Sequence, residues 1–309
     1  MTKVDLITGF LGSGKTTFLK KYALFLLDSG QKIGILENDY GAVNVDMMLL
    51  SELLGENCEL ETVAGACDYD CHKRRFKTKL IAMGMQGFDR VIIEPSGIFD
   101  VDEFFDVLHE EPLDRWYEIG SVIAIVDALS DDEFSHNSSY LLASQVANAG
   151  AVVLSKTQFA DKDKINTKID TLNKALEKVQ CDRRFGDDII SKDWSDFTAD
   201  DFKKIGESGY TIHDYTKNIL DDNNYSSLYF MNSSLSVKQL KIIVKKLLSG
   251  ENYGKIFRVK GFIKSDEKWY ELNATKKQFE LNSIDNGQEI IIVIGENLND
   301  EEIRKTFEN

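Results

Sequence analysis

The stretch GFLGSGKTT at residues 9–17 decides how the rest of the chain is interpreted. It matches the pattern G-x-x-x-x-G-K-[ST], and it lies between an apolar run at 4–8, typical of a strand, and a helical pattern at 16–27. In this setting the glycines let backbone N–H groups converge on phosphate oxygens, and the following helix adds its positive N-terminal end. The stretch therefore predicts a site for the phosphates of a nucleotide.

Individual positions of this loop have expected roles. Lys15 is expected to reach the outer phosphates, and the hydroxyl of Thr16 is expected to bind Mg²⁺. The other residues expected to line the phosphates are Gly12, Ser13, Gly14 and Thr17. A dinucleotide-binding loop is the competing interpretation, because Gly12 and Gly14 begin G-x-G-x-x-G, but the third glycine position holds Thr17. We therefore expect a triphosphate, GTP or ATP, together with Mg²⁺.

A second polar position follows the apolar run in FDRVIIE at 88–94. Glu94 ends this run, where proteins with such a loop hold the metal ion or its water. Gly97 follows in the stretch PSG, and its backbone N–H is expected to approach the γ-phosphate. Glu94 is therefore a candidate catalytic residue beside Lys15.

Apolar runs rich in Val and Ile alternate with helical patterns over the first half of the chain. The runs predicted to be strands are 4–8, 32–36, 90–93, 121–126 and 151–154. Strands buried on both faces have this composition. Their alternation with helices predicts an α/β fold with a mostly parallel sheet and helices on both faces.

The pattern changes after residue 161. A helix is predicted around 165–179. Residues 181–225 are acidic and weakly periodic, and the stretch DDNNYSS at 221–227 is typical of a linker. Further along, helices are predicted at 237–248 and 300–307, and strands at 228–231, 256–263, 269–272, 278–281 and 289–294. We expect a nucleotide-binding domain over 1–222 and a small α+β domain over 223–309.

Composition narrows the classes of function. The 309 residues carry a net charge of −15, which argues against nucleic-acid binding, because that requires clustered Lys and Arg. No apolar run is long enough for a membrane span and the N-terminus lacks a signal-peptide pattern, so a cytoplasmic location is expected. Cys181 stands apart from the other cysteines and is expected to be structural or at the surface. The scattered His109, His136 and His213 are expected at the surface or in the core.

Several stretches together resemble the CobW branch of the CobW/HypB/UreG family of P-loop GTPases. They are ITGFLGSGKTT at 7–17, ENDYGAVNVD at 37–46, VIIEPSG at 91–97, AIVDA at 124–128, VVLSK at 152–156 and GKIFRVKGFI at 254–263. The resemblance extends over nearly the whole chain. It implies a slow GTPase that binds zinc or cobalt and delivers metal to a client metalloprotein, or assists assembly of metalloenzymes or cobalamin.

The same resemblance assigns roles in the segment after the second strand. Glu37, Asn38, Asp39 and Asp46 would belong to a switch region that senses the nucleotide. Asp39 or Glu94 would then order the attacking water or the water shell of the metal ion.

The base-recognition motif departs from the family pattern. The family carries Asn-Lys-x-Asp, whose Asp accepts both guanine N–H groups, whereas this chain has Ser155-Lys156-Thr157-Gln158. Gln158 is uncharged and presents one amide carbonyl, so the choice between GTP and ATP stays open. Lys156 is still expected to cover the base, and Ser155 to make a small contact with it.

The cysteine loop departs as well. The family places Gly-Cys-x-Cys-Cys here, whereas this chain has Cys67, Cys71 and His72 after Gly65. If residues 67–71 were helical, the two thiolates would share a face and hold one ion, and soft sulfur and nitrogen ligands suit zinc. Glu37 would complete the site by analogy with the family.

Two other functions stay open at this point. The altered cysteine loop favours an NTPase switch that activates a partner protein without a transition metal. A small-molecule kinase would use the same phosphate loop, but the sequence contains no recognisable motif for a phosphoryl acceptor.

Overall fold

The computed structural model describes residues 1–39, 50–64, 69–130, 135–216, 225–231, 235–250, 252–285, 287 and 289–308. The chain divides into two compact units, Met1–Asn218 and Ile219–Asn309. This division falls within residues 217–224, outside the described ranges, and the boundary expected after residue 222 stays a prediction. Each unit is described by itself below.

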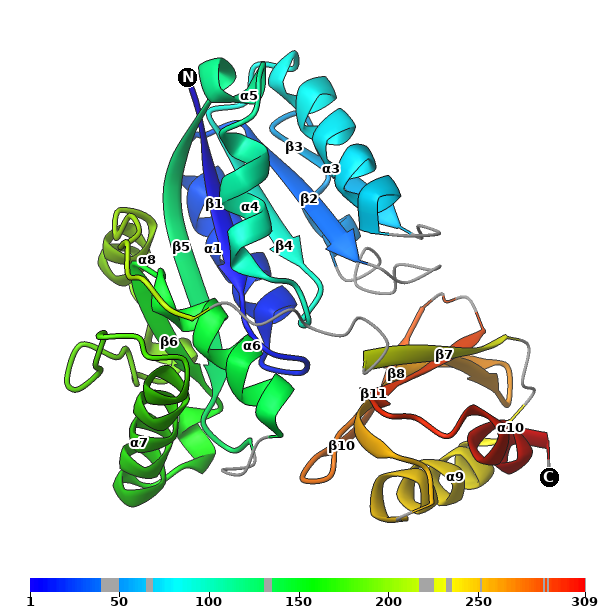
Figure 1. Cartoon of the computed structure of the whole chain (residues 1–309). Coiled ribbons are helices and arrows are strands. Elements are labelled where there is room, and N and C mark those ends of the chain that lie inside the picture. Colours follow the sequence, from blue (N-terminus) through cyan, green and yellow to red (C-terminus); the bar gives the residue numbers. More distant parts are fainter. Residues whose placement is uncertain are drawn as a thin grey trace. The chain divides into compact units, whose positions relative to one another are not determined.

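The first unit is built on a six-stranded sheet whose neighbouring strands are all parallel (Figure 1). The strands are β1 (Thr2–Thr8), β2 (Ile33–Asp39), β3 (Cys58–Ala64), β4 (Arg90–Pro95), β5 (Tyr117–Asp127) and β6 (Ala151–Ser155). Their order in the sheet is β3-β2-β4-β1-β5-β6. The predicted α/β fold with a parallel sheet is confirmed.

Helices cover both faces of this sheet, as predicted. The α-helices are α1 (Lys15–Asp28), α3 (Tyr69–Gly84), α4 (Val101–Leu108), α5 (Leu113–Trp116), α6 (His136–Ala147), α7 (Lys162–Lys178) and α8 (Ala199–Gly206). The described residues also form the short 3-10 helices η1 (Ser51–Leu53), η2 (Thr157–Phe159) and η3 (Trp194–Asp196). Helices α3 and α4 lie in front of the sheet in Figure 1, whereas α1 lies behind it.

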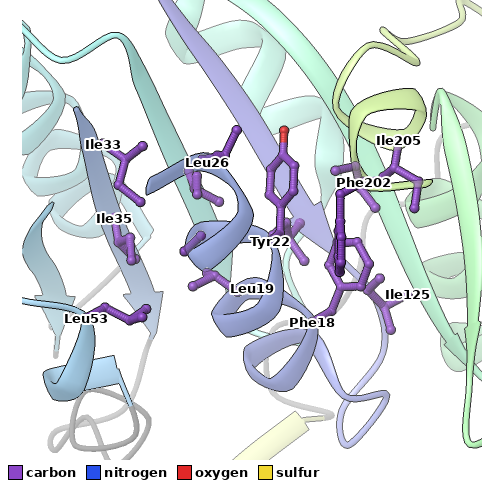
Figure 2. Close-up of a cluster of buried hydrophobic side chains, with 14 of the residues drawn as sticks. Phe18, Leu19, Tyr22, Leu26, Ile33, Ile35, Leu53, Ile125, Phe202 and Ile205 are labelled. Atoms are coloured by element: carbon purple, nitrogen blue, oxygen red, sulfur yellow. The ribbon is translucent and has the colours of Figure 1, made fainter. Parts of the chain in front are cut away.

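Helix α1 is fixed by the apolar face that it turns to the sheet. Phe18, Leu19, Tyr22 and Leu26 follow the three- and four-residue spacing of one helix face, and each is at most 2% exposed. Figure 2 shows this face against strand residues that include Ile35 and against α8. Because this packing holds the helix rigidly, it also fixes the direction of its first turn, which follows the phosphate loop.

A buried charged network joins α1 to three other elements. Arg90 Nη1 lies 2.6 Å from Asp5 Oδ2 and donates to the Gly206 carbonyl at 3.1 Å. The Tyr22 hydroxyl donates to Asp5 Oδ2 at 2.8 Å and accepts from Arg90 Nη1 at 2.6 Å. The network therefore ties β1, β4, α1 and α8 together where water is excluded.

Tyr22→Phe removes one donor to the Asp5 carboxylate with little change in volume. Burial next to Asp5 raises the pKa of the Tyr22 hydroxyl, so the hydroxyl stays protonated and able to donate. We expect the free energy of unfolding to fall by about 1.5–3 kcal/mol, measured by urea unfolding. Tyr210→Phe is the control, because that side chain is 38% exposed. Equal stability of Tyr22→Phe and the unaltered chain would contradict the assigned role.

Two parts of this unit differ from the predictions. Strand β3, CELETVA, was not predicted: it lies at the edge of the sheet, so it alternates polar and apolar residues and lacks a continuous apolar run. The weakly periodic segment 181–225, in which no helix was predicted, contains α8, which begins with a capping box on Thr198 and buries Phe202 and Ile205. Eight residues with two large apolar anchors produce only a weak helical pattern.

The second unit is the predicted small α+β fold. Its sheet order is β10-β9-β8-β11-β7, and every pair is antiparallel. The elements are β7 (Tyr225–Met231), α9 (Val237–Ser249), β8 (Lys255–Ser265), β9 (Lys268–Ala274), β10 (Phe279–Ile284), β11 (Ile290–Glu296) and α10 (Asp300–Glu308). Leu240, Val244 and Leu247 of α9 pack with strand residues of this sheet to form the core. Within the described part of the chain, no helix has the length and apolar composition needed to cross a membrane.

Candidate functional site

The phosphate loop connects the end of β1 to the start of α1, as the sequence predicts. It passes so close to β5 that a Cβ at Gly9 would lie 2.2 Å from the carbonyl oxygen of Ile125, and Gly9 has φ +144°. Only glycine fits there. The loop therefore packs closely against β5, and this contact fixes its backbone before any ligand binds.

The N-terminus of α1 has the features of an anion site. Gly14 is the N-cap residue, no side chain caps the helix, and the first turn contains no acidic residue. The first N–H groups of a helix lack intrahelical partners, and an anion at this end both satisfies them and gains from the helix dipole. The buried Ser13 Oγ also has no hydrogen-bond partner among the described residues. Phosphate oxygens would satisfy these groups, so the loop fits a nucleotide.

Lys15 and Thr16 are the first two residues of α1, directly after the phosphate loop. Lys15 is only 7% exposed, and its Nζ donates to the Gly9 carbonyl at 3.1 Å, so the amine folds back over the loop. The Thr16 hydroxyl donates to Glu94 Oε1 at 2.8 Å. Loop, lysine, hydroxyl and carboxylate are thus brought together from β1, α1 and β4.

Two candidate carboxylates are neighbours in the sheet. Glu37 of β2 pairs in register with Glu94 of β4, and the two side chains are 3% and 5% exposed. Like charges repel strongly where water is excluded, and a divalent cation balances them. The donor set therefore fits Mg²⁺, with Thr16 and Glu94 as the residues that would hold it. Asp39 ends β2, but its side chain lies outside the described part of the chain, and its catalytic role stays a prediction.

Gly97 lies directly against the phosphate loop. A Cβ at this position would lie 2.6 Å from the backbone nitrogen of Leu11, so a side chain would push the two loops apart. The carbonyl of Gly97 accepts a hydrogen bond from Gln145 Nε2 at 3.0 Å, which links it to α6. The segment expected to sense the γ-phosphate is therefore in contact with both the phosphate loop and a helix.

The expected base site lies at the end of β6. Lys156 Nζ forms an ion pair with Asp127 Oδ2 at 2.7 Å and lies 3.5 Å from the Gly12 carbonyl. A Cβ on Gly14 would lie 3.6 Å from the Cβ of Ser155 and 3.3 Å from the ring of Trp194. Ser155 and Lys156 are therefore next to the phosphate loop, where a bound nucleotide would extend.

Asp127 and Trp194 were not among the predicted site residues. Asp127 ends the strand in AIVDA, and the pattern of an acid after a buried run resembles that of Glu94. Trp194 lies in η3, and its Nε1 donates to the Leu154 carbonyl at 2.9 Å. Trp194 reaches the phosphate loop because η3 packs against the end of β6, which lies 40 residues earlier in the sequence. No local sequence pattern indicates such a contact.

The candidate transition-metal ligands are not gathered in the described structure. Cys67 lies outside the described residues, so the helical pairing of Cys67 with Cys71 stays a prediction. Cys71 is half-buried, whereas His72 is completely buried, and consecutive residues of a helix point in different directions. Among the described residues, no three or more His, Cys, Asp or Glu side chains are arranged to hold a metal ion.

The remaining cysteines and histidines lie partly in the core and partly at the surface. Cys181 is buried, which agrees with the structural one of its two expected roles, and His213 forms a hydrogen bond with Asp182 at 2.8 Å. Cys58 packs in the core beneath α1. His109 and His136 are exposed.

Cys58 is expected to resist alkylation in the folded protein. Burial, with a smaller contribution from Glu59, raises the pKa of Cys58 to about 11. The thiolate is the form that reacts with iodoacetamide. At pH 8–9, Cys58 should therefore be labelled about 100-fold more slowly in the folded protein than in the protein unfolded by urea. Peptide mass spectrometry checks this, with Cys71 as the internal comparison. The raised pKa of Cys58 adds to the free energy of unfolding at pH values below the ordinary thiol pKa. This contribution to stability is lost as the pH rises toward 11.

Comparisons with known proteins identify the families to which the two parts of the chain are similar. Residues 3–185 match the CobW/HypB/UreG nucleotide-binding domain, and residues 232–309 match the cobalamin synthesis protein cobW C-terminal domain. Zinc chaperone YjiA of Escherichia coli is 32% identical over 182 residues, which are 55% of this chain and 54% of YjiA. Zinc chaperone YeiR of the same organism is 31% identical over 160 residues, 51% of this chain and 47% of YeiR.

The chain thus spans about half the length of these curated relatives. Among solved structures, Zn(II)-bound YjiA GTPase from E. coli is 18% identical, with a TM-score of 0.36, and the match covers 99% of this chain and 98% of that one.

Proposed function

Since the chain belongs to the CobW/HypB/UreG family, we propose that it is a slow GTP hydrolase whose nucleotide cycle controls the handling of a transition metal for a client metalloprotein. The observation that carries the proposal is the hydrogen bond from Thr16 to Glu94, 2.8 Å long, at the uncapped N-terminus of α1. It joins a phosphate loop to a buried carboxylate, the pair that nucleotide hydrolysis requires. The preference for GTP over ATP comes from the family.

The residues of this chain would act mainly by binding and orienting the triphosphate. Lys15 would exchange its contact with the Gly9 carbonyl for the outer phosphates, and the amides of the loop would cradle the remaining oxygens. Bound Mg²⁺ would neutralise charge on the β- and γ-phosphates. Glu94, with Asp39 as the alternative, would orient the attacking water, and the low exposure of Glu94 keeps other water away from it.

Loss of the γ-phosphate would be sensed by Gly97 and the segment 37–46. Gly97 lies against Leu11 of the loop and is hydrogen-bonded to Gln145 of α6. A change in the loop would therefore be transmitted to α6 through direct contacts. The cysteine loop follows segment 37–46 in the sequence, so a change in that segment would make metal affinity depend on the nucleotide state.

Zinc is the proposed cargo, with cobalt as the alternative. Two relatives are named zinc chaperones, and the thiols of Cys67 and Cys71 have the softness that zinc favours. Glu37 and His72 are proposed as further ligands. A client metalloprotein and a cytoplasmic location belong to the same proposal.

The test is phosphate release from GTP and from ATP with Mg²⁺, in buffer without any acceptor, with and without zinc. We expect steady release that is faster with GTP. Absence of release from either nucleotide would overturn the proposal, and release that requires an added acceptor would assign a kinase instead. Zinc affinity that is equal in the GDP form and in a non-hydrolysable GTP form would remove the coupling.

A metal-independent NTPase switch is the second candidate. One observation favours it: the loop in which the family carries Gly-Cys-x-Cys-Cys holds only the thiols of Cys67 and Cys71 in this chain. Equilibrium dialysis against zinc separates the two, using Cys67→Ser and Cys71→Ser. Unchanged zinc binding in both variants would exclude the cysteine loop as the metal site.

A further inference from the structure

A pocket of about 400 Å³ lies between β3 and α3, at the edge of the parallel sheet. Thr62 and Val63 of β3 line one wall. The opposite wall comes from α3 and includes Cys71, Arg74, Arg75 and Lys79. Figure 1 shows α3 and β3 together at this end of the sheet. The pocket uses none of the residues of the phosphate loop.

The cations of α3 form two rows with different surroundings. Lys73 and Lys77 both pair with Glu110, at 3.1 and 2.7 Å, so these two ammonium groups share one carboxylate. The row on the pocket side is Arg74, Arg75 and Lys79, and Lys79 pairs with Glu61 of β3 at 2.5 Å.

Arg74 gives this pocket row an unbalanced positive charge. Within the described chain the Arg74 guanidinium has no carboxylate partner, and its side chain is exposed. In a protein of net charge −15, a pocket of this sign attracts anionic groups while most of the surface repels them.

The backbone beside the pocket is the edge of the sheet. β3 is the last strand. Cys58 at its start exchanges backbone hydrogen bonds with Gly55, but the described residues supply no further strand along the rest of its outer side. Successive residues of a strand point to opposite faces, yet Thr62 and Val63 both line the pocket. The pocket therefore reaches the open strand edge, which is a template for an extended peptide.

We propose that this pocket docks an extended acidic segment of a partner protein. The segment adds to β3 as a further strand and places its carboxylates on Arg74 and Arg75. Main-chain bonds along the strand provide affinity, and the arginines select acidic side chains. Cys71 is in the pocket wall, so if the proposed metal handling holds, the docked segment comes close to a candidate metal ligand.

The probe is a fluorescein-labelled peptide that alternates valine and glutamate, with a valine–lysine peptide of equal length for comparison. Anisotropy should rise with the glutamate peptide only. Arg74→Glu combined with Arg75→Glu should weaken binding at least about tenfold. Lys203→Glu combined with Lys204→Glu is the matched control, because it changes the net charge equally at two exposed positions of α8. Hydrogen exchange of residues 58–64 should slow when the peptide binds.

Several results would overturn the proposal. The first is that the glutamate peptide does not bind. The second is that both double variants weaken peptide binding equally, which would mean that net charge alone attracts the peptide. Displacement of the peptide by inorganic phosphate at equal concentration would assign the pocket to a small anion. Unchanged exchange in residues 58–64 would exclude strand addition. Phosphate release from GTP, measured on the same samples, shows separately whether the proposed hydrolase function holds.

Discussion

Lys15→Met is expected to lower the rate of GTP hydrolysis by about 100- to 1000-fold and to weaken triphosphate binding. The side chain is 7% exposed and its amine lies over the phosphate loop, 3.1 Å from the Gly9 carbonyl. Methionine keeps the length and the apolar stem but removes the charge. The outer phosphates then lose their charge-assisted partner in a site from which water is largely excluded, where such a contact is strongest.

The matched control for this prediction is Lys21→Met, an exposed position on the same helix. It removes the same charge from α1 without touching the loop, so its hydrolysis rate and nucleotide affinity should stay within about twofold of the unaltered chain. Isothermal titration with a non-hydrolysable GTP analogue and a phosphate-release assay measure the two effects. Equal behaviour of Lys15→Met and Lys21→Met would remove the phosphate loop from the mechanism.

The fold was predictable to the extent that burial leaves a periodic pattern. Strands buried on both faces, such as β4 and β6, read as continuous apolar runs and were found within a few residues of their ends. Strand β3 was not predicted because an edge strand is only partly covered, and acidic residues such as Glu59 and Glu61 interrupt its apolar pattern. Helix α8 was not predicted because its stability comes from packing against Tyr22 and Phe18 of α1, which are far away in the sequence. Its own eight residues contribute less.

The candidate site shows the same division. The loop at residues 9–14 is local, so its spacing and glycines are visible in the sequence. The register that puts Glu37 beside Glu94 depends on strand order, with β2 next to β4 although β3 lies between them in the chain. The ion pair of Lys156 with Asp127 likewise joins neighbouring strand ends. Such contacts follow from topology, which one sequence specifies only indirectly.

The other large effect is expected from Glu94→Gln. Glutamine has nearly the same shape, and its Oε1 can still accept the hydrogen bond that Thr16 now donates to Glu94 at 2.8 Å. The substitution therefore removes the negative charge with little change in packing. If Glu94 holds the metal ion or orients the attacking water, hydrolysis should fall about 100-fold, and the Mg²⁺ concentration needed for half-maximal rate should rise.

The loss of charge also acts on Glu37, which is the register partner of Glu94 and is 3% exposed. Removing one of two neighbouring buried carboxylates relieves their repulsion, so the free energy of unfolding should rise or stay equal while activity falls. Opposite changes in stability and activity are the mark of a functional charge, because a merely structural residue would lose both together. Glu118→Gln, at an exposed position of β5, is the control and should change neither quantity. A Glu94→Gln protein that hydrolyses GTP at the unaltered rate, with the same Mg²⁺ dependence, would exclude Glu94 from the chemistry and leave Asp39 as the remaining candidate.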